Sequence, residues 1–244
     1  MAAIRSLIVN ADDFGLSTGV NEAVIMTHVR GIVTSASLMV RQPAGADAAA
    51  RCREHRDLSV GLHLDMGEWS YRATTWVPVY EVVPVNDPAA VAGEAKRQLE
   101  RFRRLMGCDP THIDSHQHVH RREPVRSVAA ALAHELDVPL RHFTPEIRYC
   151  GRFYGQTAEG LPIADASTAE TLIAIVESLP SGTSELACHP GTGDEAGTMY
   201  RDERAQEVKA LCDPSVRAAL VAGRVQLCSF REVASRRRAV ANRV

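Results

Sequence analysis

Short apolar segments, typical of buried strands, alternate along the chain with segments whose apolar residues recur at helical spacing. The expected strands are residues 7–15, 33–40, 58–64, 111–119, 138–143, 185–191 and 225–230. Among the helices expected between them, the one that follows Asp87 has the strongest signals, with Asp87 as N-cap, Pro88 at the first helical position and Gly107 at the end. Because nothing resembles a two-residue hairpin, this alternation favours parallel strands joined by helical crossovers.

The pattern favours an α/β fold, and within it a single-domain irregular (β/α) barrel over residues 1–244, similar to a TIM barrel and with about seven parallel strands. A doubly wound sheet is the alternative, but neither a Gly-x-Gly-x-x-Gly sequence nor a P-loop follows any expected strand. Residues 67–86 and 145–165 lie outside the alternation, and we expect both segments to be irregular loops.

Composition narrows the class of protein further. The 244 residues are 45% apolar and 24% charged with a formal net charge of −2, as in a globular protein with a sizeable core and no basic surface for nucleic acid. No apolar run approaches the roughly 18 residues of a membrane span, and the first residues do not resemble a signal peptide. We therefore expect a cytoplasmic protein without a nucleic-acid or membrane partner, and a homodimer remains open.

Ionisable side chains occur where several expected strands end. Asp12 and Asp13 end the first strand, His63 the third, His116 and His118 the fourth, and His189 the sixth. The carboxyl ends of parallel strands meet at one rim of the fold, so these groups should lie together. This agreement between separate strands carries more weight than any single motif.

The fourth strand carries several candidate groups on one face. Strict alternation over residues 111–119 places His112, Asp114, His116 and His118 on the same side. Only one or two of them can reach a single ion, and we assign His116 to the metal as a neutral imidazole. Asp114 would then orient a histidine ring as a hydrogen-bond acceptor, and the role of His118 is left open.

One aspartate of the pair and two histidines form a plausible set of ligands for one divalent ion, with positions left for water and substrate. Such a site favours hydrolysis, in which the second aspartate acts as general base and His189 protonates a departing amine. Another metal hydrolase, such as a phosphoesterase or a different amidase, is an alternative, with Arg141 and Arg148 as candidates to hold a phosphate. A non-catalytic metal- or sugar-binding module is a further alternative, but it would not need an acidic pair.

Four segments resemble the signatures of the YdjC or ChbG family of carbohydrate deacetylases, and they occur in the family's order over nearly the whole chain. They are Asn10-Ala-Asp-Asp-Phe-Gly15, Gly61-Leu-His-Leu64, Thr111-His-Ile-Asp-Ser-His-Gln-His-Val-His120 and Cys188-His-Pro-Gly191. The resemblance implies an irregular (β/α) barrel, one divalent ion such as Mg²⁺ or Zn²⁺ bound by Asp13, His63 and His116, and Asp12 as base. It also implies removal of an N-acetyl group from an amino sugar of an oligosaccharide or glycoconjugate. Gln117 stands where some members carry a third consecutive histidine.

Aromatic residues of the two expected loops are candidates for binding the substrate. Trp69 and Trp76 belong to residues 67–86, and Tyr154 belongs to residues 145–165. Their rings could stack on the faces of sugar rings, although packing of each loop onto its own barrel is an equally good interpretation. The loop of residues 67–86 is shorter than in family members that act on chitooligosaccharides, so the sugar is left open.

Overall fold

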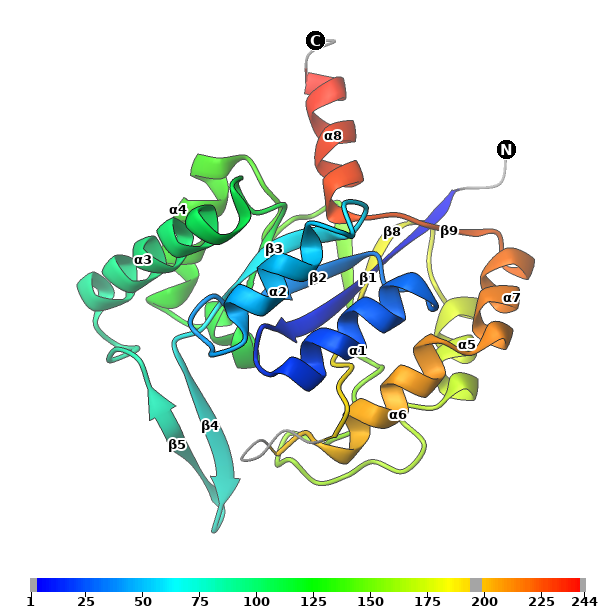
Figure 1. The fold of residues 1–244 in the computed structure, drawn as a ribbon, viewed down its shortest axis with the longest axis horizontal. Coiled ribbons are helices and arrows are strands. Elements are labelled where there is room, and N and C mark those ends of the chain that lie inside the picture. Colours follow the sequence, from blue (N-terminus) through cyan, green and yellow to red (C-terminus); the bar gives the residue numbers. More distant parts are fainter. Residues whose placement is uncertain (1–3, 194–198, 242–244) are drawn as a thin grey trace.

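The computed structural model describes residues 4–193 and 199–241, and within them a seven-stranded sheet forms the centre of the molecule (Figure 1). Its strands are β1 Arg5–Phe14, β2 Ser35–Leu38, β3 Ser59–Leu64, β6 Ile113–Ser115, β7 Ile147–Cys150, β8 Gly182–Cys188 and β9 Val225–Leu227. All pairings in this sheet are parallel, in the order β6-β3-β2-β1-β8-β7, and β9 pairs with the first residues of β1. The expected α/β class and barrel-like arrangement are therefore confirmed.

Eight α-helices are described around this curled sheet, and all but the last cover its outer face. They are α1 Thr18–Val29, α2 Gly45–Cys52, α3 Pro88–Met106, α4 Val125–Leu136, α5 Ala169–Glu177, α6 Asp202–Leu211, α7 Pro214–Ala222 and α8 Phe230–Ala241. In Figure 1, α1 and α2 lie over β1 and β2, α3 and α4 lie together on one flank, and α5, α6 and α7 lie on the other. Helix α8 extends away from the sheet at the end opposite to the strand carboxyl ends. Among the described residues, no helix is both long and apolar enough to cross a membrane.

Helix α3 forms as its sequence predicts. The Asp87 carboxylate accepts hydrogen bonds from two backbone amides of the first turn, and Pro88 occupies a position where no backbone donor is needed. The helix ends at Gly107, which adopts the left-handed conformation that glycine accepts without steric cost. Its apolar residues, among them Leu99 and Phe102, are buried against the body of the protein.

The two faces of β1 bury different chemistry. Leu7 and Val9 belong to the main apolar core beneath the helices, whereas Ile8 belongs to a small cluster with Phe230 at the start of α8. Asn10 continues the Ile8 face, and its amide donates hydrogen bonds to the Asp12 carboxylate and to a serine of β2. The interior of the half-barrel is thus apolar at the amino ends of the strands and polar towards their carboxyl ends.

Residues 67–81 form an antiparallel hairpin, so the expectation of an irregular loop there, and of no hairpin in the chain, was wrong. Strands β4 Gly67–Arg72 and β5 Thr75–Glu81 pair with each other and extend from the body of the molecule (Figure 1). The turn consists of Ala73 and Thr74, both with positive φ, at 47° and 68°. Such turns normally use Asn or Gly, and that missing signal is why the hairpin was not predicted.

The expected strand at residues 138–143 was also wrong, because this segment makes only an isolated bridge between Leu140 and Ile113. Pro139 has no backbone donor, and His142 has a φ of 67° that turns the chain. The strand after β6 is β7, which lies inside the expected loop of residues 145–165. No pairing between β6 and β7 occurs among the described residues, so the barrel stays open at this point.

Candidate active site and metal centre

The end of β1 contains a bulge that turns two consecutive carboxylates towards one site. The pairing of β1 with β2 changes register between Ala11 and Phe14, and Asp13 has a φ of 62°. In a regular strand, neighbouring side chains would point to opposite faces. The bulge instead leaves Asp12 and Asp13 both buried and both lining the same cleft. A left-handed aspartate costs on the order of 1–3 kcal/mol, which is typical of strained functional sites.

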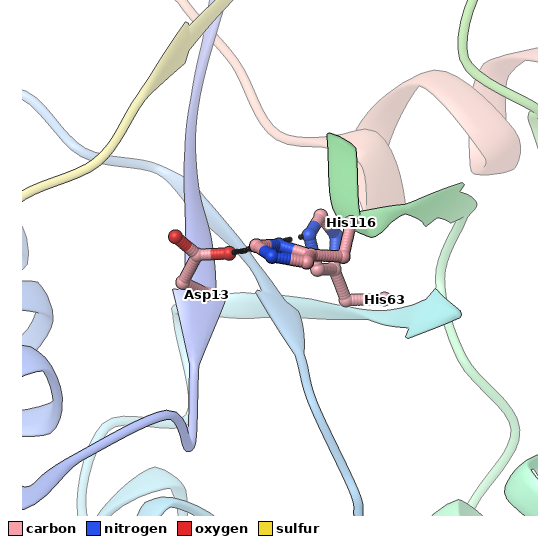
Figure 2. A group of neighbouring side chains, drawn as sticks. All are labelled: Asp13, His63 and His116. Atoms are coloured by element: carbon pink, nitrogen blue, oxygen red, sulfur yellow. Dashed lines mark hydrogen bonds and ion pairs between the residues drawn. The ribbon is translucent and has the colours of Figure 1, made fainter. Parts of the chain in front are cut away.

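Asp13, His63 and His116 converge from three different elements (Figure 2). Asp13 ends β1, His63 lies in β3, and His116 begins the 3-10 helix η1, His116–Arg121. One potential ligand atom from each side chain lies within 4.8 Å of the other two. The distances to Asp13 Oδ1 are 2.9 Å from His116 Nδ1 and 3.5 Å from His63 Nε2.

These side chains fit a divalent ion in their surroundings as well as in their chemistry. The second Asp13 oxygen accepts a hydrogen bond from Arg204 at 2.6 Å, which leaves Oδ1 to face the two histidines. His116 Nε2 is buried without a hydrogen-bond partner among the described residues. Burial alone would lower the pKa of His63, yet Asp114 and Asp13 raise it to about 10, so the site favours positive charge. One carboxylate and two imidazoles suit Zn²⁺ or another divalent ion with open coordination positions.

Asp114 and Arg141 form a polar layer directly beneath this group. Asp114 Oδ1 accepts a hydrogen bond from His63 Nδ1 at 2.7 Å, which directs His63 Nε2 towards Asp13. The Arg141 guanidinium contacts the carboxylates of Asp12, Asp114 and Glu185, at distances of 2.6–2.9 Å. All of these charged groups are buried, so each depends on the others for compensation.

Asp12 is held as an ionised carboxylate next to the group of potential ligands. Arg141 donates to both of its oxygens, at 2.6 and 2.7 Å. Burial raises the pKa of Asp12, but the Arg141 guanidinium more than offsets this effect and holds the pKa below its ordinary value. Asp12 is therefore available as a proton acceptor at neutral pH.

His189 follows β8 directly and lies beside Asp12. Its Nε2 is 3.7 Å from Asp12 Oδ2. The Glu207 carboxylate accepts hydrogen bonds from the backbone amide of His189 and from the Tyr200 hydroxyl. Burial lowers the pKa of His189 to about 4 and raises that of Glu207 to about 8. The His189 ring is thus neutral at neutral pH, and its buried Nδ1 has no hydrogen-bond partner among the described residues, although Glu207 Oε1 lies 4.0 Å away.

The expected strand at residues 111–119 ends early, and this separates His116 from His118. Strand β6 stops at Ser115, and Gln117 and His118 have φ values of 48° and 54° inside η1. The two histidines therefore do not share a strand face. His118 Nδ1 lies 2.8 Å from His142 Nε2, and the Tyr149 hydroxyl lies 3.3 Å from His118 Nε2. His118 lines the cleft but lies outside the group of potential metal ligands.

A cleft of about 1090 Å³ opens above these groups, slightly larger than the range of about 300–1,000 Å³ for small-molecule sites. Trp69 and Trp76 of the hairpin line it, as does Tyr154 from the loop after β7. Trp76 is 47% exposed and Tyr154 is 37% exposed, so both rings have free surface. The Gln117 side chain bonds both the backbone N–H and the C=O of Trp69, at 2.9 and 2.8 Å, which ties the hairpin to η1.

Several charged residues of the site were not predicted from the sequence. Arg204, Glu207 and Glu185 were missed, and Arg141 was considered only as a phosphate ligand. Arg204 and Glu207 lie three residues apart on the buried face of α6, and charged residues on the apolar side of a helix are a signal that could have identified them. Arg141 lies between Leu140 and His142 in the segment that joins the two edges of the half-barrel, without any comparable pattern.

Comparison with known proteins gives matches along nearly the whole chain. A carbohydrate deacetylase of Geobacillus stearothermophilus is 35% identical in an alignment that covers 93% of this chain and 98% of the relative. A chitooligosaccharide deacetylase of Serratia marcescens is 29% identical and covers 94% of this chain and 99% of its own. The crystal structure of an Enterococcus faecalis protein with a proposed role in cellobiose-phosphate cleavage superposes with a TM-score of 0.75 at 24% identity, over 95% of this chain and 99% of that one.

The family assignment follows from the sequence match and agrees with the resemblance of the four strand-end segments. The model of the family described as YdjC-like protein matches residues 6–222, a range that includes all but the first residue of β1, the whole of η1 and the His189 segment. The chain belongs to the YdjC-like protein family.

Proposed function

We propose that this protein is a metal-dependent hydrolase that removes the N-acetyl group from an amino sugar and releases acetate. The observation that supports it best is the convergence of Asp13, His63 and His116 beside the ionised carboxylate of Asp12. The names of the Geobacillus and Serratia relatives support the same activity. Because those relatives match over almost their full length, we extend the proposal to residues 1–244 as one deacetylase domain.

In this proposal Asp13, His63 and His116 hold one divalent ion, Mg²⁺ or Zn²⁺. When bound, such an ion polarises the carbonyl of the substrate amide and lowers the pKa of a neighbouring water molecule. Asp12 accepts the proton of that water, because Arg141 keeps its carboxylate ionised and oriented. Asp114 keeps the His63 ring in the orientation that ligand binding requires.

His189 supplies a proton to the nitrogen of the departing amine. Since burial leaves the His189 ring neutral in the resting site, this proton has to reach it during the reaction. Asp12 is placed to pass on the proton taken from water, because its Oδ2 lies 3.7 Å from His189 Nε2. The bond between the acetyl carbon and the nitrogen then breaks, and acetate and the free amine leave.

The substrate we propose is an N-acetylated sugar within an oligosaccharide or a glycoconjugate. Trp69, Trp76 and Tyr154 offer aromatic faces on which sugar rings can stack. The phosphoesterase alternative loses support, because neither arginine considered for it is placed to bind a phosphate. The Arg141 guanidinium is already paired with buried carboxylates, and Arg148 does not line the cleft. A purely binding role would leave the ionised Asp12 beside the ligand group without a purpose.

The test of the proposed function is acetate release from a panel of N-acetylated monosaccharides, oligosaccharides and glycoconjugates, with Mg²⁺, Zn²⁺ or a chelator added. We expect acetate release that depends on the metal, together with one free amine per acetate. A protein that binds metal and sugar but releases no acetate from any substrate would contradict the proposal.

The role of His189 predicts a difference between amide and ester substrates. Replacing His189 with alanine should lower turnover of an N-acetyl substrate more than that of the matching O-acetyl ester, because an alkoxide leaving group needs less protonation than an amine. Rates on the two substrates, measured with the same preparation, give the ratio directly. Equal losses on both would show that His189 acts in structure or binding instead. His134→Ala, on the exposed surface of α4, serves as the control.

A further inference from the structure

The Glu68 carboxylate is an acidic group of the cleft that the proposed chemistry does not use. Glu68 follows Gly67 at the start of β4, where the hairpin leaves the body of the protein. The residue is only 8% exposed, yet it lines the same cleft as Asp12 and His116. It is contributed by the hairpin and not by a strand of the main sheet.

No hydrogen bond or ion pair within residues 4–193 and 199–241 satisfies this carboxylate. It lines the cleft together with His116, Asp13 and Arg204, whose charges all act on it. The Glu68 oxygens keep some solvent contact, but partial burial removes part of their hydration at a cost, which raises the pKa of this carboxyl group. A donor supplied by a bound molecule would remove this cost.

The geometry disfavours two kinds of occupant. Glu68 belongs to neither group of side chains whose potential ligand atoms lie within 4.8 Å of one another, so it lies outside the metal-binding arrangement. A cationic ligand would be repelled by Arg204 and by a divalent ion at Asp13, both on the same side of the cleft. An uncharged hydroxyl group donates a hydrogen bond without this repulsion.

The backbone around Glu68 keeps its side chain in place. Gly67 has a φ of 149°, and a Cβ atom there would lie 2.7 Å from the Tyr80 carbonyl oxygen, so only glycine fits at this point. The pairing of β4 with β5 is irregular between Glu68 and Trp69, and Gln117 holds the backbone of Trp69 on the other side. Glu68 is therefore positioned by the hairpin as a whole.

We propose that Glu68 binds a ring hydroxyl of the sugar that carries the acetamido group and thereby selects the substrate. This inference rests on the proposed deacetylase function and adds a specificity-determining contact to it. The hairpin then contributes both an aromatic surface, through Trp69 and Trp76, and a polar contact close to the scissile amide. A sugar that lacks this hydroxyl, or presents it in the opposite configuration, would be a poor substrate.

The experiment compares Glu68→Ala and Glu68→Gln with the wild type on N-acetylglucosamine oligosaccharides and on analogues that lack one ring hydroxyl each. We expect kcat/KM of Glu68→Ala to fall about 10- to 100-fold on the parent sugar, the loss typical of a hydrogen bond to a charged group. For one deoxy analogue, the wild type should show a similar loss and Glu68→Ala no further loss. Glu68→Gln should retain part of the activity, because its amide oxygen still accepts a hydrogen bond.

Matched controls separate binding of the sugar hydroxyl from a role of Glu68 in metal binding or in the structure of the hairpin. Glu81→Gln removes an exposed carboxylate of the same hairpin, whose Oε1 accepts a bond from Val85, and should keep the wild-type rate. Metal affinity, measured by calorimetry, should stay unchanged in both Glu68 variants. The assignment would be overturned by a loss of metal affinity in Glu68→Ala, or by a wild-type kcat/KM in that variant. It would also be overturned if, for every deoxy analogue, the loss caused by the missing hydroxyl and the loss caused by Glu68→Ala multiplied. A wild-type protein that releases no acetate would instead remove the proposed function itself.

Discussion

Replacing Asp12 with asparagine should lower turnover by about 10²- to 10⁴-fold, the loss typical of removing general-base catalysis. Asparagine keeps the size of the side chain and one acceptor oxygen for Arg141, but it cannot take up a proton. Metal content and sugar binding should therefore stay close to those of the wild type. Acetate release measured at saturating substrate, alongside metal analysis of the same samples, tests both expectations.

A neighbouring carboxylate provides a matched control for the Asp12 variant. Glu185 contacts the same Arg141 guanidinium but does not line the cleft, so Glu185→Gln changes the shared buried network without touching the reaction. Its loss of turnover should be far smaller than that of Asp12→Asn. If Asp12→Asn were close to wild type while Asp13→Asn lost activity with its metal still bound, the two aspartate roles would be reversed. If neither mattered, the deacetylase proposal would fail.

Removing either histidine of the potential ligand group should abolish stable metal binding and, with it, activity. His63→Ala and His116→Ala each take away one of three converging donors, and we expect a larger loss of affinity than the about 10- to 100-fold drop typical of losing an outer hydrogen-bond partner. Asp114→Asn should cause a smaller loss of metal affinity, because it disturbs only the hydrogen bond that orients His63. Calorimetric titration with Zn²⁺ and Mg²⁺ gives all of these affinities.

The position of His118 makes it an informative comparison for the metal experiment. It lines the cleft, but its hydrogen bonds go to His142 and Tyr149 and not to the ligand group. His118→Ala should therefore keep one metal ion per chain. Unchanged metal content and affinity in both His63→Ala and His116→Ala would show that the ion binds elsewhere.

The local pattern of the sequence determined the fold class and the position of the rim. Capping residues at Asp87 and Gly107, together with apolar strands separated by helices, were enough to predict a parallel α/β fold with about seven strands. Because the carboxyl ends of parallel strands meet at one edge, the placement of Asp12, Asp13, His63 and His189 in one cleft also followed. These inferences depend on periodicity and topology, both of which a single sequence contains.

Only the tertiary structure decided how the individual side chains point. The bulge at Asp13 and the left-handed residues Gln117 and His118 break the period-two rule, and strict alternation could not anticipate them. The hairpin turn at Ala73 and Thr74 uses residues that rarely adopt positive φ. Such conformations persist because surrounding contacts outweigh their local cost, and those contacts come from distant parts of the chain.

The charged partners of the site residues could not be predicted from the sequence either. Arg141 bonds Asp12 across 129 residues, and Arg204 bonds Asp13 across 191 residues. No local propensity marks a pairing of this kind, because its free energy depends on burial and on the other charges in the same interior layer. The sequence by itself thus determined which groups reach the rim, and the tertiary structure decided which of them are paired, ionised or left free to meet a ligand.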